Sequence, residues 1–271
     1  MTKPMWSILM NQEILNEILN QDYASIEKTI EEFLKNQVTK NNSKGLIFGL
    51  SGGVDSAIIA YLCHKVFQTK YMALLMPDSR ISPKTETEDA LMLVDKLKLD
   101  YKLIDIYPII NQYSKYLEPS EKALGNMRTR VRANLLYYYA NLKNYLVVGS
   151  SDKSEYLIGY FTKFGDGSAD LLPIVSLYKT QVKKMGEYLG VPESILSKKS
   201  SPHLWLNHLA EEEIGMKYEE IDSILYCLFH KKFSVEETEK ITQIEKASID
   251  KVYKLYKNSQ HKRITPERPF E

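Results

Sequence analysis

The sequence predicts an α/β fold: a doubly wound, mostly parallel sheet with flanking helices and a helical extension at the C-terminus. Three observations predict it. Four short apolar runs recur over the first two thirds of the 271 residues, segments of helical periodicity separate them, and the chain beyond residue 176 is mostly helical in pattern. Apolar runs that alternate with helices are typical of parallel βαβ units.

Each expected strand is a mostly apolar run without regular polar alternation, which indicates a strand buried on both faces. The four runs are residues 45–50, 71–76, 101–106 and 145–149. Helical periodicity precedes the first run at residues 26–34 and follows it at residues 58–66. A further helix is expected at residues 91–97, after the second strand, and a long one at residues 126–142, before the fourth.

The C-terminal third begins with an expected helix at residues 178–189, for which Gly190 is a suitable C-cap with Pro192 beyond it. Two later helices are expected at about residues 217–230 and 234–256. The sequence contains no internal repeat and no Pro/Gly-rich linker. We therefore interpret the whole chain, residues 1–271, as a single domain with a helical extension from about residue 176.

Composition and charge exclude several classes of protein. The chain is 44% hydrophobic and 26% charged with a formal net charge of +1, whereas a dedicated nucleic-acid-binding protein usually has a basic excess. Cys63 and Cys227 lie in apolar helical patterns, which argues against a disulfide framework or a zinc cluster. Residues 1–15 contain no apolar core of signal-peptide length, and no run is long enough to span a membrane. We expect a cytoplasmic protein whose partners include neither a nucleic acid nor a membrane.

The most informative stretch is "LSGGVDS", at the corner between the first expected strand and the helix after it. In an open α/β sheet, ligands bind beyond the carboxyl ends of the strands. Gly52 and Gly53 let the backbone turn sharply and approach a ligand, and the first helical turn presents unpaired amides. With the hydroxyls of Ser51 and Ser56, these features predict a cradle for phosphate groups. The alternative is an ordinary glycine turn in which Asp55 and Ser56 only start the helix.

This stretch differs from two common phosphate-binding motifs, because it lacks the G-K-[ST] ending of a Walker A loop and the G-x-G-x-x-G spacing of a dinucleotide fold. It resembles the S-G-G-x-D-S signature of the ATP pyrophosphatases, the PP-loop family. The resemblance implies cleavage of ATP between its α- and β-phosphates to adenylate a substrate. It also implies that Asp55 is a magnesium ligand, since an acidic side chain among phosphates is unfavourable unless a cation lies between them.

Four further segments resemble the ammonia-dependent NAD synthetases, and the resemblance runs from about residue 23 to the end of the chain. The segments are residues 125–140 ("GNMRTRVRANLLYYYA"), 149–174 ("GSSDKSEYLIGYFTKFGDGSADLLPI"), 177–182 ("LYKTQV") and 259–269 ("SQHKRITPERP"). A capping box of Asp152 and Glu155 is the structural alternative at the start of the second segment. That alternative leaves the dense glycine-rich part of the segment unexplained.

The resemblance assigns site residues one by one. It implies that ATP is bound by Gly49, Leu50, Ser51, Gly52, Gly53, Val54, Asp55, Ser56, Ser150, Lys179 and Ser201. It implies that Mg2+ is held by Asp55 and Glu155, and that deamido-NAD is bound by Arg130, Lys163, Asp170, His261 and Lys262. Each assignment has a simpler alternative. Arg128, Arg130 and Arg132 could form a solvated helix face, and Lys179 could be an exposed lysine in a first helical turn.

One block departs from the family pattern, which reads approximately P-P-S-A-x-L-W-x-G-Q-T-D-E-x-E-L-G after Lys198. Here residues 199–215 read "KSSPHLWLNHLAEEEIG", so that Asn-His-Leu-Ala at residues 207–210 replaces G-Q-T-D. The flanking positions, among them Trp205, stay in register. The departure leaves the expected fold intact, but it puts closure of this segment, turnover and substrate preference in question.

The reaction that the resemblance implies joins ammonia to the nicotinate carboxylate of deamido-NAD in two steps. Transfer of AMP from ATP neutralises the carboxylate and creates a leaving group, while Mg2+ held by Asp55 acts with Lys179 on the phosphates. Ammonia then displaces AMP to give NAD. Asp170 could hold the ammonium or the pyridinium, and the sequence leaves open which. Free ammonia is the expected donor, because the glutamine-using relatives carry a large additional domain.

Two other functions stay open at this point. Another ATP pyrophosphatase, such as a tRNA-thiolating enzyme or a GMP-synthetase-type domain, would adenylate a different substrate. A non-catalytic nucleotide-binding paralogue is suggested by the altered residues 207–210. The family resemblance further implies a homodimer with the dinucleotide near the subunit interface, and the tyrosine-rich helix at residues 126–142, with Tyr137, Tyr138 and Tyr139, is a candidate contact.

Overall fold

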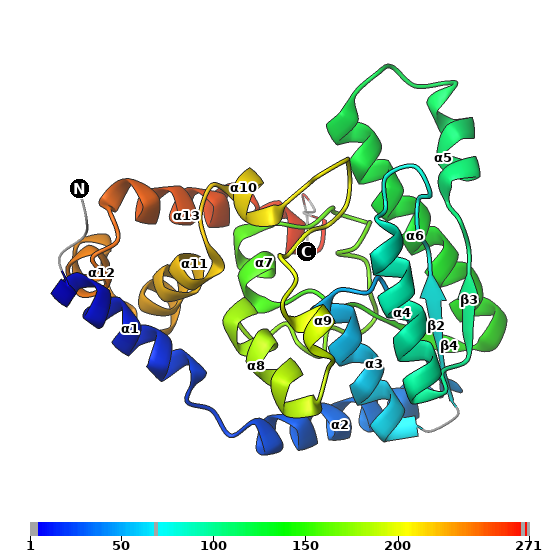
Figure 1. Cartoon of the computed structure of the whole chain (residues 1–271), viewed down its shortest axis with the longest axis horizontal. Helices are drawn as coiled ribbons and strands as arrows, with labels where there is room; N and C mark the ends of the chain where they lie inside the picture. Colours follow the sequence, from blue (N-terminus) through cyan, green and yellow to red (C-terminus); the bar gives the residue numbers. More distant parts are fainter. Residues whose placement is uncertain (1–4, 68–69, 267–268, 270–271) are drawn as a thin grey trace.

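The computed structural model describes residues 5–67, 70–266 and 269. Within them, four strands form one sheet whose neighbours are all parallel, in the order β3-β2-β1-β4. Figure 1 shows the helices arranged around this sheet. The strands are β1 (Gly45–Gly49), β2 (Tyr71–Leu75), β3 (Tyr101–Leu103) and β4 (Tyr145–Val148). In register, Leu46 of β1 lies opposite Tyr71 on one side and Leu146 on the other. This is the doubly wound parallel sheet that the sequence predicts.

The third strand differs from the expectation. The sequence predicts a strand buried on both faces at residues 101–106, whereas β3 has three residues and all of them are exposed. The prediction of burial is wrong here because β3 is the last strand in the order and pairs along one edge with β2 alone. β1 and β2, which lie inside the sheet, are buried almost throughout.

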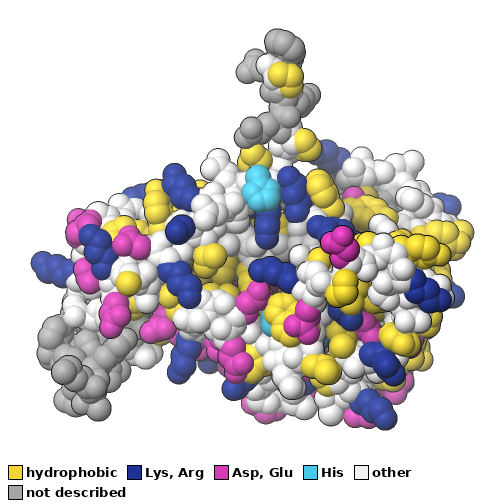
Figure 2. Space-filling view, turned by 90° about the horizontal axis from the view of Figure 1, so that it is seen from above, with side chains coloured by type: hydrophobic (Ala, Val, Ile, Leu, Met, Phe, Trp, Pro, Cys, Tyr) yellow, Lys and Arg dark blue, Asp and Glu magenta, His cyan; other side chains and the backbone are white. Residues whose placement is uncertain are grey.

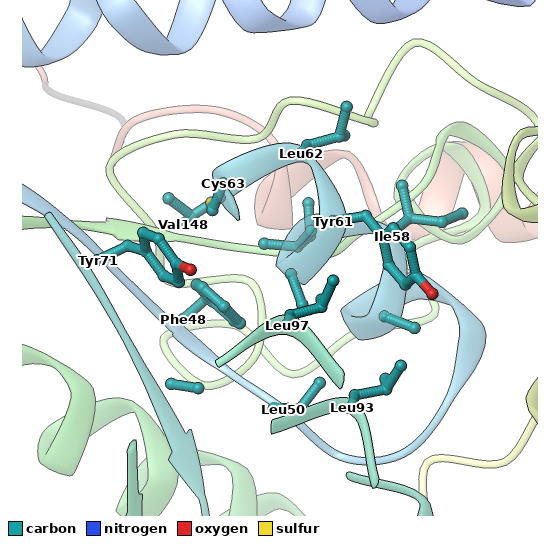
Figure 3. Packing of buried hydrophobic residues seen from close by; sticks show 14 of the residues in the cluster. Phe48, Leu50, Ile58, Tyr61, Leu62, Cys63, Tyr71, Leu93, Leu97 and Val148 are labelled. Atoms are coloured by element: carbon teal, nitrogen blue, oxygen red, sulfur yellow. The ribbon is translucent and has the colours of Figure 1, made fainter. Parts of the chain in front are cut away.

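Helices cover both faces of the sheet, and alternate side chains of a strand reach different faces. The helices on the first face are α2 (Tyr23–Lys40), α3 (Val54–Phe67), α4 (Lys84–Leu97) and α8 (Lys179–Leu189). Figure 3 shows Phe48 of β1 there, together with Ile58 and Leu62 of α3 and Leu93 of α4. The side chains of this face form the main apolar core.

The second face is covered by α5 (Tyr107–Ser114) and α6 (Glu121–Lys143). Ile47 of β1 and Leu74 of β2 pack there with Ile110 of α5 and Val131 of α6. The helix expected at residues 126–142 begins five residues earlier, at Glu121. Ser120 is its N-cap, and the Ser120 hydroxyl accepts a hydrogen bond from the backbone N–H of Ala123.

Beyond residue 176 the described chain is mostly helical, as predicted. After α8 come α9 (Glu193–Leu196), α10 (Ala210–Ile214), α11 (Tyr218–Leu225), α12 (Val235–Thr242) and α13 (Lys246–Asn258), with short helical turns at Tyr226–His230 and Gln260–Lys262. One further short helix, α7 (Lys153–Ile158), follows β4. Gly190 caps α8 with a φ of 75°, as predicted. The prediction of one helix at residues 234–256 is wrong, because Gln243 adopts a left-handed φ of 57° and ends α12.

α1 (Met5–Leu19) has no counterpart among the expected helices. Figure 1 shows it beside α11 and α12, and its Ile14, Leu15 and Ile18 are buried in the apolar cluster of the C-terminal helices. The N-terminal helix therefore packs on the helical extension rather than on the sheet. No helix in the described part of the chain combines the length and apolarity needed to cross a bilayer.

Candidate active site

A cavity of about 630 Å³ lies where the strand order reverses between β1 and β4. Open α/β sheets bind ligands at such a reversal, beyond the carboxyl ends of the strands. The cavity is lined by residues after β1, β2 and β4, by the start of α8 and by residues from the 198–214 segment. The residues that the sequence assigns to ATP all line it except Gly52: Gly49, Leu50, Ser51, Gly53, Val54, Asp55, Ser56, Ser150, Lys179 and Ser201.

The loop between β1 and α3 is held in shape by its own hydroxyls. Gly52 has a φ of 90°, and a Cβ added to it would lie 2.1 Å from the backbone oxygen of Glu86, so only glycine fits. The backbone N–H of Ser51 donates to Oγ of Ser56 at 3.1 Å, and that hydroxyl is 3.0 Å from the carbonyl of Gly53, to which it donates. Ser56 therefore stabilises the loop from within, whereas Ser51 is exposed to the cavity.

Lys198 fixes the same loop from the outside. Its Nζ donates to the carbonyl of Gly52 at 3.1 Å and forms ion pairs with Glu86 at 3.0 Å and Asp89 at 2.6 Å, both on α4. The sequence analysis assigned Lys198 no role. Its contacts depend on the packing of two segments more than a hundred residues apart, and no local pattern indicates them.

The centre of the site is a buried ammonium surrounded by carboxylates. Lys179 is fully buried, and its Nζ lies 2.8 Å from Asp55, 2.6 Å from Asp152 and 2.8 Å from Glu155. The alternative of an exposed first-turn lysine is therefore wrong. Tyr218 lies against the same group, with the ring centroid 5.3 Å from Nζ. The cluster joins the starts of α3, α7 and α8.

Burial and close charges shift the pKa values of this cluster. Burial alone would lower the pKa of Lys179, but Asp152, Asp55 and Glu155 together raise it well above its usual value. Burial, together with the charge of Asp152, raises the pKa of Glu155 to about 8. Burial also raises the pKa of Asp152. Lys179 therefore stays a cation, and one ammonium cannot neutralise three carboxylates when all are ionised.

Asp222 of α11 holds the elements that carry these groups. Its buried carboxylate accepts a hydrogen bond from the hydroxyl of Ser154 and another, at 2.9 Å, from the backbone N–H of Thr180. The Ser154 hydroxyl in turn accepts from the backbone N–H of Lys179 at 2.9 Å. One carboxylate thus connects α7 and α8 at the residues next to Glu155 and Lys179. The sequence analysis missed Asp222, because its position gives no local signal.

The donor set fits a divalent cation shared with a nucleotide. Asp55 and Glu155 line the cavity, and their side chains are 23% and 18% exposed. Mg2+ is usually held by one or two carboxylates together with substrate phosphates rather than by a complete protein cage. In agreement, no group of three acidic, His or Cys side chains among the described residues is arranged to hold a metal by itself. A bound cation would also favour the ionised form of Glu155, whose pKa is raised by burial and by the charge of Asp152.

The residues assigned to deamido-NAD divide into two groups. Lys262 lines the cavity, and its Nζ donates to the carbonyls of Gly159 and Phe161, both at 2.7 Å. The other basic residues lie outside the cavity lining and contact one another. Arg130 donates to the carbonyl of Lys163 at 3.3 Å, and Nζ of Lys163 donates to the carbonyl of His261 at 2.7 Å.

Two aspartates of the glycine-rich segment differ in their access to the cavity. The carboxylate of Asp170 accepts from the hydroxyl of Tyr137 at 3.2 Å and from the backbone N–H of Val147 at 2.7 Å, and it lies outside the lining. Asp166 lines the cavity and accepts from the backbone N–H of Thr162 at 2.8 Å. The sequence analysis overlooked Asp166, although it lies in the same motif.

The three arginines of α6 do not form one solvated face. Arg128 is buried, pairs with Asp78 at 2.7 Å and donates to the carbonyl of Leu204 at 3.0 Å. Arg132 lines the cavity and donates to the carbonyl of Met76 at 2.9 Å, and burial lowers its pKa to about 10. Arg128 and Arg132 therefore brace the cavity wall. From the sequence, Arg128 and Arg132 are expected only as members of a solvated helix face.

Several known proteins are similar to this chain in sequence and in fold. The profile of the NAD synthase family matches residues 26–266. The chain is 49% identical over 263 residues to a Staphylothermus marinus protein named NH(3)-dependent NAD(+) synthetase, with 94% of each covered. Among solved structures it is similar to an NMN synthetase from Francisella tularensis, with a TM-score of 0.82, 31% identity, and 93% of this chain and 100% of that one covered. It is also similar to the NH3-dependent NAD synthetase from Campylobacter jejuni, with a TM-score of 0.78, 32% identity, and 92% and 99% covered.

Proposed function

The chain belongs to the NAD synthase family, and from that membership we propose that it is a ligase that amidates deamido-NAD with ammonia to give NAD. ATP is the co-substrate and is converted to AMP and pyrophosphate. The observation that carries the proposal is the meeting of Asp55, Glu155 and Lys179 beside the glycine loop in one cavity. Such a site can bind a nucleotide triphosphate and act on its phosphates.

ATP binding is assigned to the loop after β1 and to the wall opposite it. The loop carries Gly53, which has only Ser51 Oγ within reach of an added Cβ, at 3.5 Å. Backbone amides at the start of α3 and the helix dipole favour phosphate oxygens at this place. Ser150 and Ser201, which line the cavity from two other segments, supply further hydroxyl donors.

Mg2+ is assigned to Asp55 and Glu155, the carboxylates that combine contact with Lys179 and exposure to the cavity. Bound together with ATP, the ion supplies positive charge for the phosphate oxygens. Asp152 is completely buried beside Lys179, so its role is to keep the ammonium in place. The assignment divides the three carboxylates into two that face the ligand and one that supports the lysine.

The first chemical step forms a bond between a nicotinate carboxylate oxygen and the α-phosphorus of ATP. The bond from that phosphorus to the bridging oxygen breaks, and pyrophosphate leaves with the electron pair. Negative charge grows on the bridging oxygen, where a fixed cation lowers the barrier. Lys179 is such a cation, because three carboxylates hold its ammonium at the cavity before any substrate arrives.

The second step is attack of ammonia on the carbonyl carbon of the adenylate, which releases AMP. Ammonium transfers one proton to a carboxylate before its nitrogen attacks, and that nitrogen releases a second proton as the amide forms and AMP leaves. Asp166 lines the cavity, whereas the carboxylate of Asp170 is taken up by Tyr137 and Val147 outside it. We therefore assign the capture of ammonium to Asp166. Asp170 keeps a positioning role for the segment that follows β4.

A homodimer is the proposed assembly, through the face of α5, α6 and β3. Exposed apolar side chains gather there: Tyr116 is 85%, Tyr138 62%, Leu142 67% and Leu103 50% exposed. Of the three adjacent tyrosines of α6, Tyr138 is the one that is mostly exposed. Light scattering at micromolar concentration tests the assembly, and a fully active monomer would contradict it.

The cavity also supports the proposal that residues 1–271 act as one domain. It is lined by loops of the sheet and by residues of the helical extension, among them Glu213 of α10 and Leu255 of α13.

Cys63 and Cys227 are buried free thiols, which suits a reducing compartment, and we propose the cytoplasm. On the face seen in Figure 2, basic side chains are interspersed with acidic and apolar ones, which supports the proposal that the partners do not include a nucleic acid.

A nicotinate mononucleotide is the second candidate substrate, because one similar structure is that of an NMN synthetase at 31% identity. The proposed function is tested by mixing the purified chain with ATP, Mg2+, deamido-NAD and ammonium. We expect NAD, AMP and pyrophosphate in equal amounts, and no NAD when glutamine replaces ammonium. Release of pyrophosphate only with some other acceptor would favour a different ATP pyrophosphatase. Binding of ATP without any turnover would favour a nucleotide sensor.

A further inference from the structure

His208 belongs to the block at residues 207–210 that departs from the family pattern, and the fold buries it. Its exposed fraction is 3%, and its ring is stacked on the indole of Trp205, with centroids 3.5 Å apart and planes at 13°. Trp205 lines the cavity, and His208 does not. Trp205 therefore forms part of the cavity wall, and the imidazole of His208 packs behind it.

The same imidazole holds two polar groups of that wall. Its Nε2 lies 2.8 Å from Oε2 of Glu213 and 3.1 Å from the hydroxyl of Tyr160, and this hydroxyl donates to the same Glu213 oxygen at 2.8 Å. Because the Tyr160 proton is used on Glu213, the pattern assigns the Nε2–H tautomer to His208, with Nε2 donating to the carboxylate. Tyr160 and Glu213 both line the cavity.

The backbone of His208 takes part in the same wall. Its carbonyl accepts a hydrogen bond from the hydroxyl of Ser201, which lines the cavity on the other side of Trp205 in the chain. Nδ1 of the ring is buried and has no hydrogen-bond partner among the described residues. A buried nitrogen without a partner is unfavourable, so the stacking and the Nε2 bond must offset its cost. The position of the ring is therefore set by its contacts with Trp205, Tyr160 and Glu213.

We propose that His208 is a positioning residue that keeps Trp205, Tyr160 and Glu213 together as a wall against bulk water. The inference rests on the proposed function, because an adenylated carboxylate is destroyed by water. Water attacks the carbonyl carbon in place of ammonia, AMP leaves, and deamido-NAD is regenerated. A site that holds this intermediate until ammonia arrives has to exclude solvent. Without the imidazole, the indole loses the ring behind it, and the wall opens.

The ratio of AMP to NAD measures this leak directly. Wild type should form the two products in equal amounts. His208→Ala should raise the ratio at least about threefold, because water competes with ammonia in an opened site. His208→Phe, which retains an aromatic ring against Trp205 but cannot hydrogen-bond Glu213, should raise the ratio less than His208→Ala does. His230→Ala is the matched control, since His230 is also a stacked histidine, on Tyr226 and outside the cavity lining.

Fluorescence of Trp205 provides the second measurement, in a Trp6→Phe background that leaves it as the only tryptophan of the chain. Acrylamide should quench Trp205 more strongly in His208→Ala than in wild type or His208→Phe. An unchanged product ratio in His208→Ala, or an equal rise in both His208 variants, would overturn the inference. If wild type forms no AMP, the proposed function fails, and the quenching result alone decides whether His208 holds the wall. If His208→Ala does not fold, an intact ratio in His208→Gln, which has no ring to stack, overturns the inference.

Discussion

The ammonium nitrogen of Lys179 lies 2.8 Å from a carboxylate oxygen of Asp55, although 124 residues separate them in the chain. Asp55 lies in the first turn of α3, after β1, and Lys179 begins α8. The parallel sheet brings the two helix starts together where the strand order reverses. The contact connects the loop proposed to bind phosphate with the cation proposed to act on it.

Asp55→Asn should lower turnover on the order of a hundredfold, because the change removes one of the two carboxylates assigned to Mg2+. Stability should change little, since asparagine keeps an acceptor for Lys179 and one of three crowded carboxylates is gone. Steady-state kinetics at saturating Mg2+ and thermal unfolding check both parts. Asp95→Asn, at an exposed position of α4, is the control. Near-normal turnover of the Asp55 variant would remove it from the metal site.

Gly52→Ala should lower the stability of the fold, whereas Gly53→Ala should weaken ATP binding. At Gly52 the φ of 90° and the backbone oxygen of Glu86 at 2.1 Å make alanine costly, by about 1–3 kcal/mol of unfolding free energy or more. At Gly53 an added Cβ meets Ser51 Oγ at an ordinary 3.5 Å, so the fold should persist. Its methyl group would instead occupy the phosphate cradle and raise the KM for ATP. Urea unfolding and ATP kinetics separate the two effects, and a stable Gly52→Ala protein would refute the loop geometry.

The stability difference between wild type and Asp222→Asn should shrink as pH rises. Burial raises the pKa of Asp222 to about 7, from an ordinary value of 3.8. Between these values the folded state keeps a proton that the unfolded state has released, so this group's stabilisation is complete below pH 3.8 and is lost as pH rises through 7. The slope is at most about 1.4 kcal/mol per pH unit. Urea unfolding of both proteins at several pH values tests it, and a constant difference would mean that Asp222 has an ordinary pKa.

Lys262→Ala should raise the KM for deamido-NAD more than the KM for ATP. We expect roughly a tenfold rise for the dinucleotide, equivalent to about 1.4 kcal/mol. The lysine also donates to the carbonyls of Gly159 and Phe161, so thermal unfolding of the variant has to be measured alongside. Lys254→Ala, at an exposed position of α13, serves as the control. An equal rise for both substrates would point to a general distortion of the cavity.

The same kinetic comparison decides between the two candidate pyridine nucleotides. Deamido-NAD should give a higher kcat/KM than nicotinate mononucleotide, because the mononucleotide lacks the adenosine half and its phosphate. Equal or better kcat/KM with the mononucleotide would show that the larger substrate is wrongly assigned. The measurement needs only the wild-type chain and the two substrates.

The elements that sequence predicts well are those with a local physical signature. Strands inside a parallel sheet give continuous apolar runs, and residues 45–50 and 71–76 form the two interior strands. β4 lies at one edge, but Leu171 pairs with its outer side at Val148, so the apolar run at residues 145–149 is also partly buried. β3 lies at the other edge without such a bridge among the described residues, and all three of its residues are exposed. The break at Gln243 has neither glycine nor proline to mark it, and the buried Ile244 follows directly after it.

The site was predictable to the extent that its chemistry requires special residues in sequence. The two glycines and Asp55 stand in one short motif, since a phosphate loop needs that backbone. The burial of Lys179 and the contacts of Asp222 arise only when α7, α8 and α11 pack together. Asp166 and Asp170 lie four residues apart, and only the path of the loop decides which of them reaches the cavity.

Transfer of a carboxylate oxygen to AMP tests the central claim most directly. Deamido-NAD labelled with oxygen-18 in its nicotinate carboxylate is incubated with the wild-type chain, ATP, Mg2+ and ammonium, and the products are analysed by mass spectrometry. If the carboxylate is adenylated, each AMP carries one labelled oxygen, and the NAD amide retains the other. Unlabelled AMP, or ADP together with labelled orthophosphate, would contradict the account.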